Sequence, residues 1–126
     1  MENQVLVTEI CPTTTQKWIE KGAILLDVRE RHEIEQIAFD VRDIINIPIS
    51  EFEFRYWEVP KDKTVVVVCK AGVRSLRAAA FLIVWGYSRV ASMKHGIEHW
   101  AQKGYPVKGD TSLILENEYE CICPAS

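Results

Sequence analysis

The sequence has no apolar run long enough to cross a membrane and no excess of positive charge. Its longest apolar stretch, Ala78–Trp85, is far shorter than the ~18 residues of a membrane-spanning helix. The first residues, Met1–Gln4, lack the basic start and apolar core of a secretory signal peptide, so we expect none. The formal net charge of −3 gives no reason to expect nucleic acid or an anionic membrane as a partner. Any site for an anion must therefore come from a local feature of the fold.

Cysteine is also scarce, with Cys11, Cys69, Cys121 and Cys123 as the four in 126 residues. This number and spacing do not make the disulfide framework of a small secreted domain, so we expect reduced thiols and a cytoplasmic protein. The chain has no internal repeat and no low-complexity segment. With 48% apolar and 26% charged residues, it has the composition of a globular protein. A chain of this length has room for one domain with one core.

Short apolar segments alternate with segments that suit helices. The expected strands, bounded by turn residues or by charge, are 23–28, 44–49, 64–68 and 88–92. The expected helices are 12–21, about 52–57, 73–85 and 97–103. Apolar strands that alternate with helices are typical of a mostly parallel sheet covered on both faces. The sequence therefore predicts an α/β fold.

The character of the chain changes near residue 109. We expect a domain over residues 1–108 and a C-terminal extension or tail over 109–126. Within the extension, Ser112–Leu115 has the composition of one more strand.

Two groups of polar residues follow strands of the expected sheet. Asp27 and Arg29 stand where one strand ends, and Cys69 follows the last valine of another. In open α/β sheets, ligands bind at the carboxyl ends of the strands. The sequence thus places a thiol and an Asp/Arg pair at one edge of the sheet.

Cys69 opens a short loop, Cys69-Lys70-Ala71-Gly72-Val73-Arg74-Ser75, which runs directly into a helix. Such a loop directs unpaired backbone N–H groups and the positive end of the helix dipole toward one point, which favours a thiolate. Gly72 permits a bend that other residues resist. Lys70 and Arg74 add positive charge where an anion would arrive.

The segment Val67–Ser75 resembles the active-site loop of rhodanese domains, in which a cysteine takes up sulfane sulfur as a persulfide. Three further segments are similar to the family pattern in the expected order, over about residues 8 to 108. They are Leu25–Glu30 with its Asp-Val-Arg, Ile45–Pro48 with its Asn-Ile-Pro, and 85–107 with its Gly-Tyr, Gly-Ile-x-x-Trp and Gly-x-Pro-Val.

The resemblance implies a rhodanese-like central sheet of about five strands and a two-step sulfur transfer. Cys69 would take sulfur from a thiosulfate-like anion and pass it to cyanide, a thiol or a protein acceptor, with no metal or organic cofactor. Lys70, Ala71, Gly72, Val73, Arg74 and Ser75 would form the substrate-binding loop around the sulfur. Asp27 and Arg29 would brace the loop.

The chain departs from the family pattern at two places. Phe39–Ile44 replaces a Gly-His-Ile-x-Gly-Ala stretch, which puts the local loop shape in doubt. His95 replaces the first glycine of Gly-Gly-Ile, which puts an imidazole near the rim of the pocket. His95 is therefore either a residue of the pocket rim with a function or an ordinary polar surface residue.

Several roles stay open at this point. Arg74 either pairs with an acidic side chain or contacts the substrate, and Lys70 either steers anions or is merely solvated. Ser75 either caps the helix or lines the site. Trp18, Trp57, Trp85 and Trp100 are expected in the core or the pocket wall.

The tail motif Cys121-Ile122-Cys123 has three possible interpretations. It is a dithiol that takes sulfur from Cys69, part of a metal site, or a tail without a function. Two nearby thiolates are too few for a structural zinc site, which needs four ligands.

Two other function classes remain in view. Some dual-specificity phosphatases share the fold, but their loop has five residues between cysteine and arginine, whereas Lys70–Val73 supplies four. A persulfide carrier or protein-interaction module with little small-molecule turnover is the main alternative. Inactive family members typically lack the loop cysteine, and this chain keeps Cys69.

Overall fold

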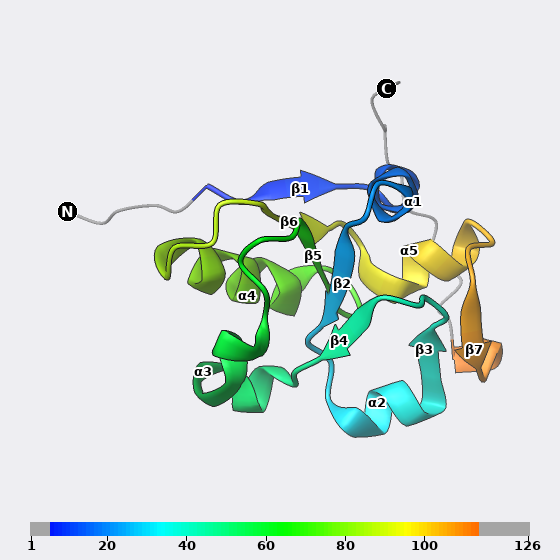
Figure 1. Cartoon of the computed structure of the whole chain (residues 1–126). Helices are drawn as coiled ribbons and strands as arrows, with labels where there is room; N and C mark the ends of the chain where they lie inside the picture. The colour runs from blue at the N-terminus through cyan, green and yellow to red at the C-terminus, as the bar shows by residue number, and fades with distance from the viewer. Residues whose placement is uncertain (1–5, 114–126) are drawn as a thin grey trace.

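A parallel five-stranded sheet forms the centre of the structure, a computed structural model that describes residues 6–113 (Figure 1). The strands lie in the order β1-β6-β5-β2-β4, and every neighbouring pair is parallel. Their bounds are β1 Thr8–Ile10, β2 Ile24–Asp27, β4 Ile44–Asn46, β5 Val65–Val68 and β6 Val90–Met93. The predicted α/β fold with about five mostly parallel strands is confirmed.

Helices cover both faces of this sheet (Figure 1). The helices are α1 Pro12–Glu20, α2 Arg31–Gln36, α3 Phe52–Arg55, α4 Val73–Val84 and α5 Gly96–Gln102. Three 3-10 turns are η1 Ile49–Glu51, η2 Tyr56–Glu58 and η3 Thr111–Leu113. A small antiparallel sheet pairs β3 Ile37–Phe39 with β7 Val107–Gly109.

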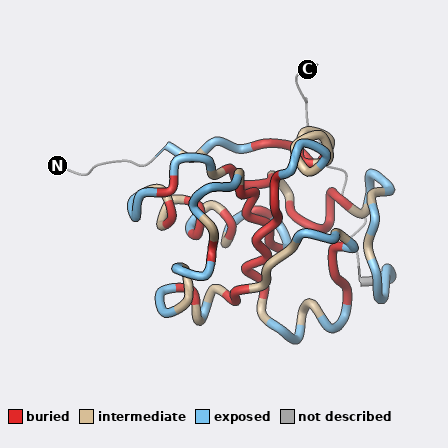
Figure 2. Tube along the Cα trace, viewed as in Figure 1, coloured by how far each residue is buried: buried red, intermediate tan, exposed pale blue. Residues whose placement is uncertain are grey.

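The central strands are buried on both faces because their alternate side chains enter two separate cores. Leu26 and Val67 pack with Leu82 of α4 on one face. Leu25 and Val66 pack with Trp100 of α5 on the other. Figure 2 shows the resulting column of buried chain through the middle of the molecule. This double burial is the reason why β2 and β5 are continuous apolar runs in the sequence.

Some sequence predictions of local structure were wrong. Strands β1, β3 and β7 were not foreseen, and Ser112–Leu113 belongs to a 3-10 turn instead of a strand. The rest of that proposed strand lies outside the described residues. Trp57 is 70% exposed and Trp85 is 53% exposed, so neither is a core residue, whereas Trp100 is fully buried.

The reason for the exposure of Trp57 is the broken helix after β4, whereas Trp85 is exposed at the C-cap of α4. The expected helix of about residues 52–57 is divided into α3 and η2, so its aromatic side chains do not share one buried stripe. Within the described residues, no helix has the length and apolarity needed to span a membrane.

Candidate active site

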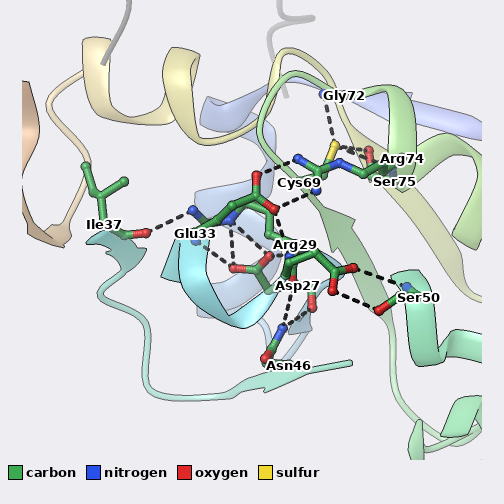
Figure 3. A network of polar contacts seen from close by, with 11 residues as sticks. Asp27, Arg29, Glu33, Ile37, Asn46, Ser50, Cys69, Gly72, Arg74 and Ser75 are labelled. Atoms are coloured by element: carbon green, nitrogen blue, oxygen red, sulfur yellow. Dashed lines mark hydrogen bonds and ion pairs between the residues drawn. The ribbon is translucent and has the colours of Figure 1, made fainter. Parts of the chain in front are cut away.

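Cys69 lies at the carboxyl end of β5, at the base of the loop that leads into α4 (Figure 3). Its side chain is free and only 1% of the residue is exposed. The backbone N–H of Gly72 donates to Cys69 Sγ at 3.1 Å, and that of Ser75 donates at 3.4 Å. Ser75 Oγ also lies 3.4 Å from Sγ and shares a 2.8 Å hydrogen bond with Ser92 Oγ. The loop thus directs two backbone N–H donors at the sulfur, and the thiol in turn donates to Ser75 Oγ.

The start of α5 holds the loop in this shape. The N–H of Ile97 donates to the carbonyl of Cys69 at 2.9 Å. Gly96 has φ +57°, and a Cβ there would lie 2.2 Å from the carbonyl oxygen of Lys70. Gly72 has φ +97°, and a Cβ there would lie 2.9 Å from the backbone nitrogen of His95. Two close backbone approaches, both possible only with glycine, therefore fix the loop against α5.

Arg74 forms a two-point ion pair with Glu33 of α2, with distances of 2.7 and 2.8 Å. Of the two roles considered for Arg74, the structure shows the pairing with an acidic side chain. Hydrogen bonds from Arg74 are the main cause that lowers the pKa of Glu33 from 4.5 to about 2, and they raise the pKa of Arg74.

Glu33 is a site residue that the sequence reasoning missed. The signal for it is a capping box in which the Glu33 carboxylate accepts the N–H of Glu30 at 2.8 Å. Glutamate three residues after the N-cap is a mark of a helix start. Since α2 follows β2 directly, this helix start had to lie at the same sheet edge as Cys69.

Asp27 and Arg29 form a buried ion pair beside the loop, with exposures of 2% and 1%. Arg29 Nη2 and Nε donate to the Asp27 carboxylate at 2.9 to 3.2 Å. Arg29 Nη1 also donates to the carbonyl of Ile37 at 2.9 Å, and Asn46 Nδ2 donates to the carbonyls of Asp27 and Arg29. These contacts tie β2 to β3 and β4, and Asp27 stands opposite Val68 in the sheet register.

The remaining loop residues differ in exposure. Lys70, Ala71 and Val73 are exposed, whereas Gly72 is buried. A cavity of about 130 Å³ adjoins the loop, and its lining includes Arg29, Glu33, Ile37, Lys70 and Glu98. A larger cavity of about 370 Å³ lies at the opposite edge of the sheet, between the amino ends of the strands, so cavity size does not mark the thiol site.

His95 precedes α5 with φ 61°, and its ring contacts that of His99 at a centroid distance of 5.5 Å. Burial is the main cause that lowers the pKa of His99, and the positive charges of His95 and Lys103 lower it further. His95 therefore meets the loop through its backbone at Gly72, while its ring meets α5.

Cys11 departs from the expectation of reduced thiols, because it is disulfide-bonded. It follows β1 directly, occupies the N-cap position of α1 and is 3% exposed. Cys121 and Cys123 lie outside the described residues.

Comparisons with known proteins point to one family. Residues 12–103 match the model of the rhodanese-like domain family. A sulfurtransferase of Allochromatium vinosum is 38% identical over 87 residues, which cover 69% of this chain and 79% of that protein. The thiosulfate sulfurtransferase GlpE of Actinobacillus pleuropneumoniae is 33% identical over 103 residues, covering 80% of this chain and 93% of GlpE.

Among solved structures, a rhodanese-related protein from Thermoplasma volcanium superposes with a TM-score of 0.73 at 33% identity. The match covers 82% of this chain and 99% of that one.

Proposed function

The chain belongs to the rhodanese-like domain family, and from this we propose that it is a sulfurtransferase that carries sulfane sulfur as a persulfide on Cys69. The observation that carries the proposal is the pair of backbone N–H groups, from Gly72 and Ser75, that point at a free Cys69 thiol. Donors fixed in place stabilise negative charge on the attacking and leaving sulfur without reorganisation.

We further propose thiosulfate, or a donor like it, as the sulfur source. Cys69 thiolate attacks the outer sulfur of thiosulfate, the sulfur–sulfur bond of the donor breaks, and sulfite leaves with the electron pair. A nucleophile such as cyanide or a thiol then attacks the outer sulfur of the persulfide, and Cys69 leaves as thiolate. The identity of the donor as thiosulfate finds support in the name of the GlpE relative and in the exposed Lys70, which adds positive charge at the entrance.

The other site residues receive supporting roles in this proposal. Gly72 and Ser75 bind the sulfur, and Ala71 and Val73 complete the loop backbone. Arg74 holds the loop through Glu33, and the Asp27–Arg29 pair holds the strand end beneath it. We place His95 at the rim as a backbone contact of Gly72.

We also propose a cytoplasmic setting, in which a reducing compartment keeps Cys69 available as a thiol; the disulfide at Cys11 is the observation that speaks against it. The proposed catalytic domain is residues 1–108, with 109–126 as an extension.

The test is a thiosulfate:cyanide sulfurtransferase assay on the full chain, Cys69→Ala and Cys69→Ser, with intact mass after thiosulfate treatment. We expect thiocyanate formation and one added sulfur, both lost in the two variants. The serine variant controls for packing, because its hydroxyl fits the space of the thiol. One added sulfur without turnover would instead favour a persulfide carrier that serves a protein partner. No added sulfur on a folded protein would overturn the sulfur proposal.

A further inference from the structure

A second cavity, of about 370 Å³, lies at the amino ends of the parallel strands, on the opposite side of the sheet edge that carries Cys69. Its volume falls in the range of small-molecule sites, roughly 300–1,000 Å³. Its lining comes from β1, from the end of α1 and from the turns before β5 and β6. Because these strands are parallel, their amino ends meet at one edge and bring the lining residues together.

The sheet itself fixes the base of this cavity. Ala23, Thr64 and Arg89 line it, and each stands directly before a strand. The N–H of Ile24 donates to the carbonyl of Thr64 at 2.9 Å, and the N–H of Val65 donates to the carbonyl of Arg89 at 2.9 Å. The three lining positions therefore lie side by side across neighbouring strands, in a spacing set by the backbone.

Among the described residues that line the cavity, two are cations and none has a carboxylate. Lys21 is the C-cap of α1 and Arg89 precedes β6, and within the described chain neither forms an ion pair. Arg89 Nη2 donates to the carbonyl of Asp62 at 2.6 Å, which holds the guanidinium in place and leaves its other N–H groups as donors. A cleft lined by one sign of charge raises the local concentration of the opposite ion. The lining thus favours an anion, although the whole chain has a net charge of −3.

Hydroxyl groups add neutral donors to the same lining. Within the described residues, none of the three hydroxyls is hydrogen-bonded to another protein group. They belong to Thr8, Thr64 and Ser88. The carbonyl of Trp18, at the end of α1, would repel an anion, but it already accepts the N–H groups of Lys21 and Ala23 at 3.0 Å.

Trp18 gives the cavity an aromatic wall. Its ring is partly buried and packs against the core cluster that contains Leu25 and Trp100. An aromatic ring held by the core loses little conformational freedom when a ligand binds, so it is suited to contact a flat apolar ring. The lining therefore combines a site for negative charge with a site for a ring.

We propose that this cavity binds a small aromatic anion, such as a mononucleotide or an aromatic carboxylate. Lys21 and Arg89 pair with the charged group, the hydroxyls bind its polar atoms, and Trp18 contacts the ring. The site does not depend on the proposed function, since Cys69 lies at the other ends of the strands.

Ligand titration of the ¹⁵N-labelled full chain, followed by the indole N–H signals in proton–nitrogen correlation spectra, tests this proposal. The signals belong to Trp18, Trp57, Trp85 and Trp100, and Trp18→Phe identifies that of Trp18. The probes are adenosine monophosphate and salicylate, each of which joins a flat ring to an anionic group. Adenosine and inorganic phosphate are the comparison probes, because each carries only one of these two features.

We expect an aromatic anion at millimolar concentration to shift the Trp18 signal in a saturable way. The signals of Trp57 and Trp85 should stay in place, although these residues are 70% and 53% exposed. Adenosine and inorganic phosphate should each bind about tenfold more weakly than adenosine monophosphate, since each lacks half of the contacts. Cys69→Ala should bind the probes as the natural chain does.

Lys21→Gln and Arg89→Gln should each weaken the binding of the anionic probe by about tenfold, because each removes one positive charge from the lining. Lys108→Gln is the matched control, since it removes an exposed lysine of β7 that does not line the cavity. Lys21→Gln is the more informative variant. The Lys21 side chain holds no other described residue, whereas Arg89 also holds the turn at Asp62.

No change of the Trp18 signal with either aromatic anion would overturn the proposal. Equal shifts of Trp18, Trp57 and Trp85 would also overturn it, because they would show stacking on any exposed ring. Equal affinity of the natural chain and a folded Lys21→Gln variant would overturn the recognition of the anion. None of these results bears on sulfur transfer at Cys69, which its own assay measures.

Discussion

Arg74, in the first turn of α4, and Glu33, in α2, form a two-point ion pair with distances of 2.7 and 2.8 Å. The side chains are 28% and 20% exposed, so the pair is partly shielded from water. It joins the loop after β5, which begins at Cys69, to the helix after β2. Arg74 therefore holds the loop against α2 through this ion pair.

The Arg74–Glu33 ion pair predicts that the free energy of unfolding depends on pH in the acid range. The pKa of Glu33 is about 2 in the fold against an ordinary value of 4.5, so between these pH values the unfolded chain binds a proton that the folded chain does not. The free energy of unfolding should therefore fall as the pH drops from about 5 to 2. Glu33→Gln should lower it by about 1 kcal/mol at pH 7 and flatten this part of the profile. Urea unfolding at several pH values measures both effects.

Glu33→Gln should also lower sulfurtransferase turnover by about tenfold, since a loop that shifts by a fraction of an ångström misplaces its donors. Glu58→Gln is the control, because it removes a carboxylate from the exposed Arg55–Glu58 pair, outside the loop. Equal activity losses in the two variants would argue against a role of the Arg74–Glu33 ion pair in holding the loop.

Gly96→Ala tests whether α5 sets the shape of the loop. The added Cβ would lie 2.2 Å from Lys70 O and 2.4 Å from Cys69 O, and neither backbone atom yields without moving the loop. We expect a loss of about a hundredfold in turnover per folded molecule.

Gly104→Ala is the matched control for that experiment. Gly104 also has a positive φ, +83°, but a Cβ there meets nothing within 4 Å. The variant should lose about 1–2 kcal/mol of stability and keep its turnover within about twofold. Turnover is normalised to folded protein by circular dichroism. Unchanged turnover in Gly96→Ala would mean that the loop does not depend on this contact.

The central sheet could be predicted because β2 and β5 are buried on both faces and are therefore apolar throughout. The loop after β5 could be predicted because its glycine, charges and cysteine stand next to each other in the sequence. The capping box marks Glu33 as a residue of a helix start, but its ion pair with Arg74 joins residues 41 positions apart and is not encoded in any local pattern.

Strands β1 and β3 were missed for a different reason. Each has three residues, and Thr8 and Glu9 of β1 are exposed, so neither strand has a readable periodicity. The segment Phe39–Ile44, which departs from the family pattern, has a structural role that only the three-dimensional contacts reveal. Its first residue ends β3, and the Phe39 ring packs beneath the Arg29 guanidinium at 5.5 Å.

The Asp27–Arg29 pair predicts a large cost for the loss of one partner. Both residues are almost fully buried, so Arg29→Met or Asp27→Asn leaves a charge without its counterion. Each single change should lower the free energy of unfolding by about 3–5 kcal/mol, and the double change should cost much less than the sum. Urea unfolding of the natural chain, the two single variants and the double variant gives the double-mutant cycle that measures this coupling. Additive losses would mean that the two side chains stabilise the strand end independently.

His95 predicts a difference between two substitutions that both remove its ring. Its φ of 61° is in the left-handed region, which glycine adopts freely and alanine does not. His95→Gly should therefore be more stable than His95→Ala by about 1 kcal/mol, as measured by thermal or urea unfolding. Because His95 meets the loop through its backbone nitrogen at Gly72, both variants should keep thiosulfate:cyanide turnover within about twofold of the natural chain. A large and equal loss of turnover in both variants would show instead that the imidazole takes part in the reaction. The two variants differ in how well their backbone adopts the left-handed conformation, and they share only the missing ring.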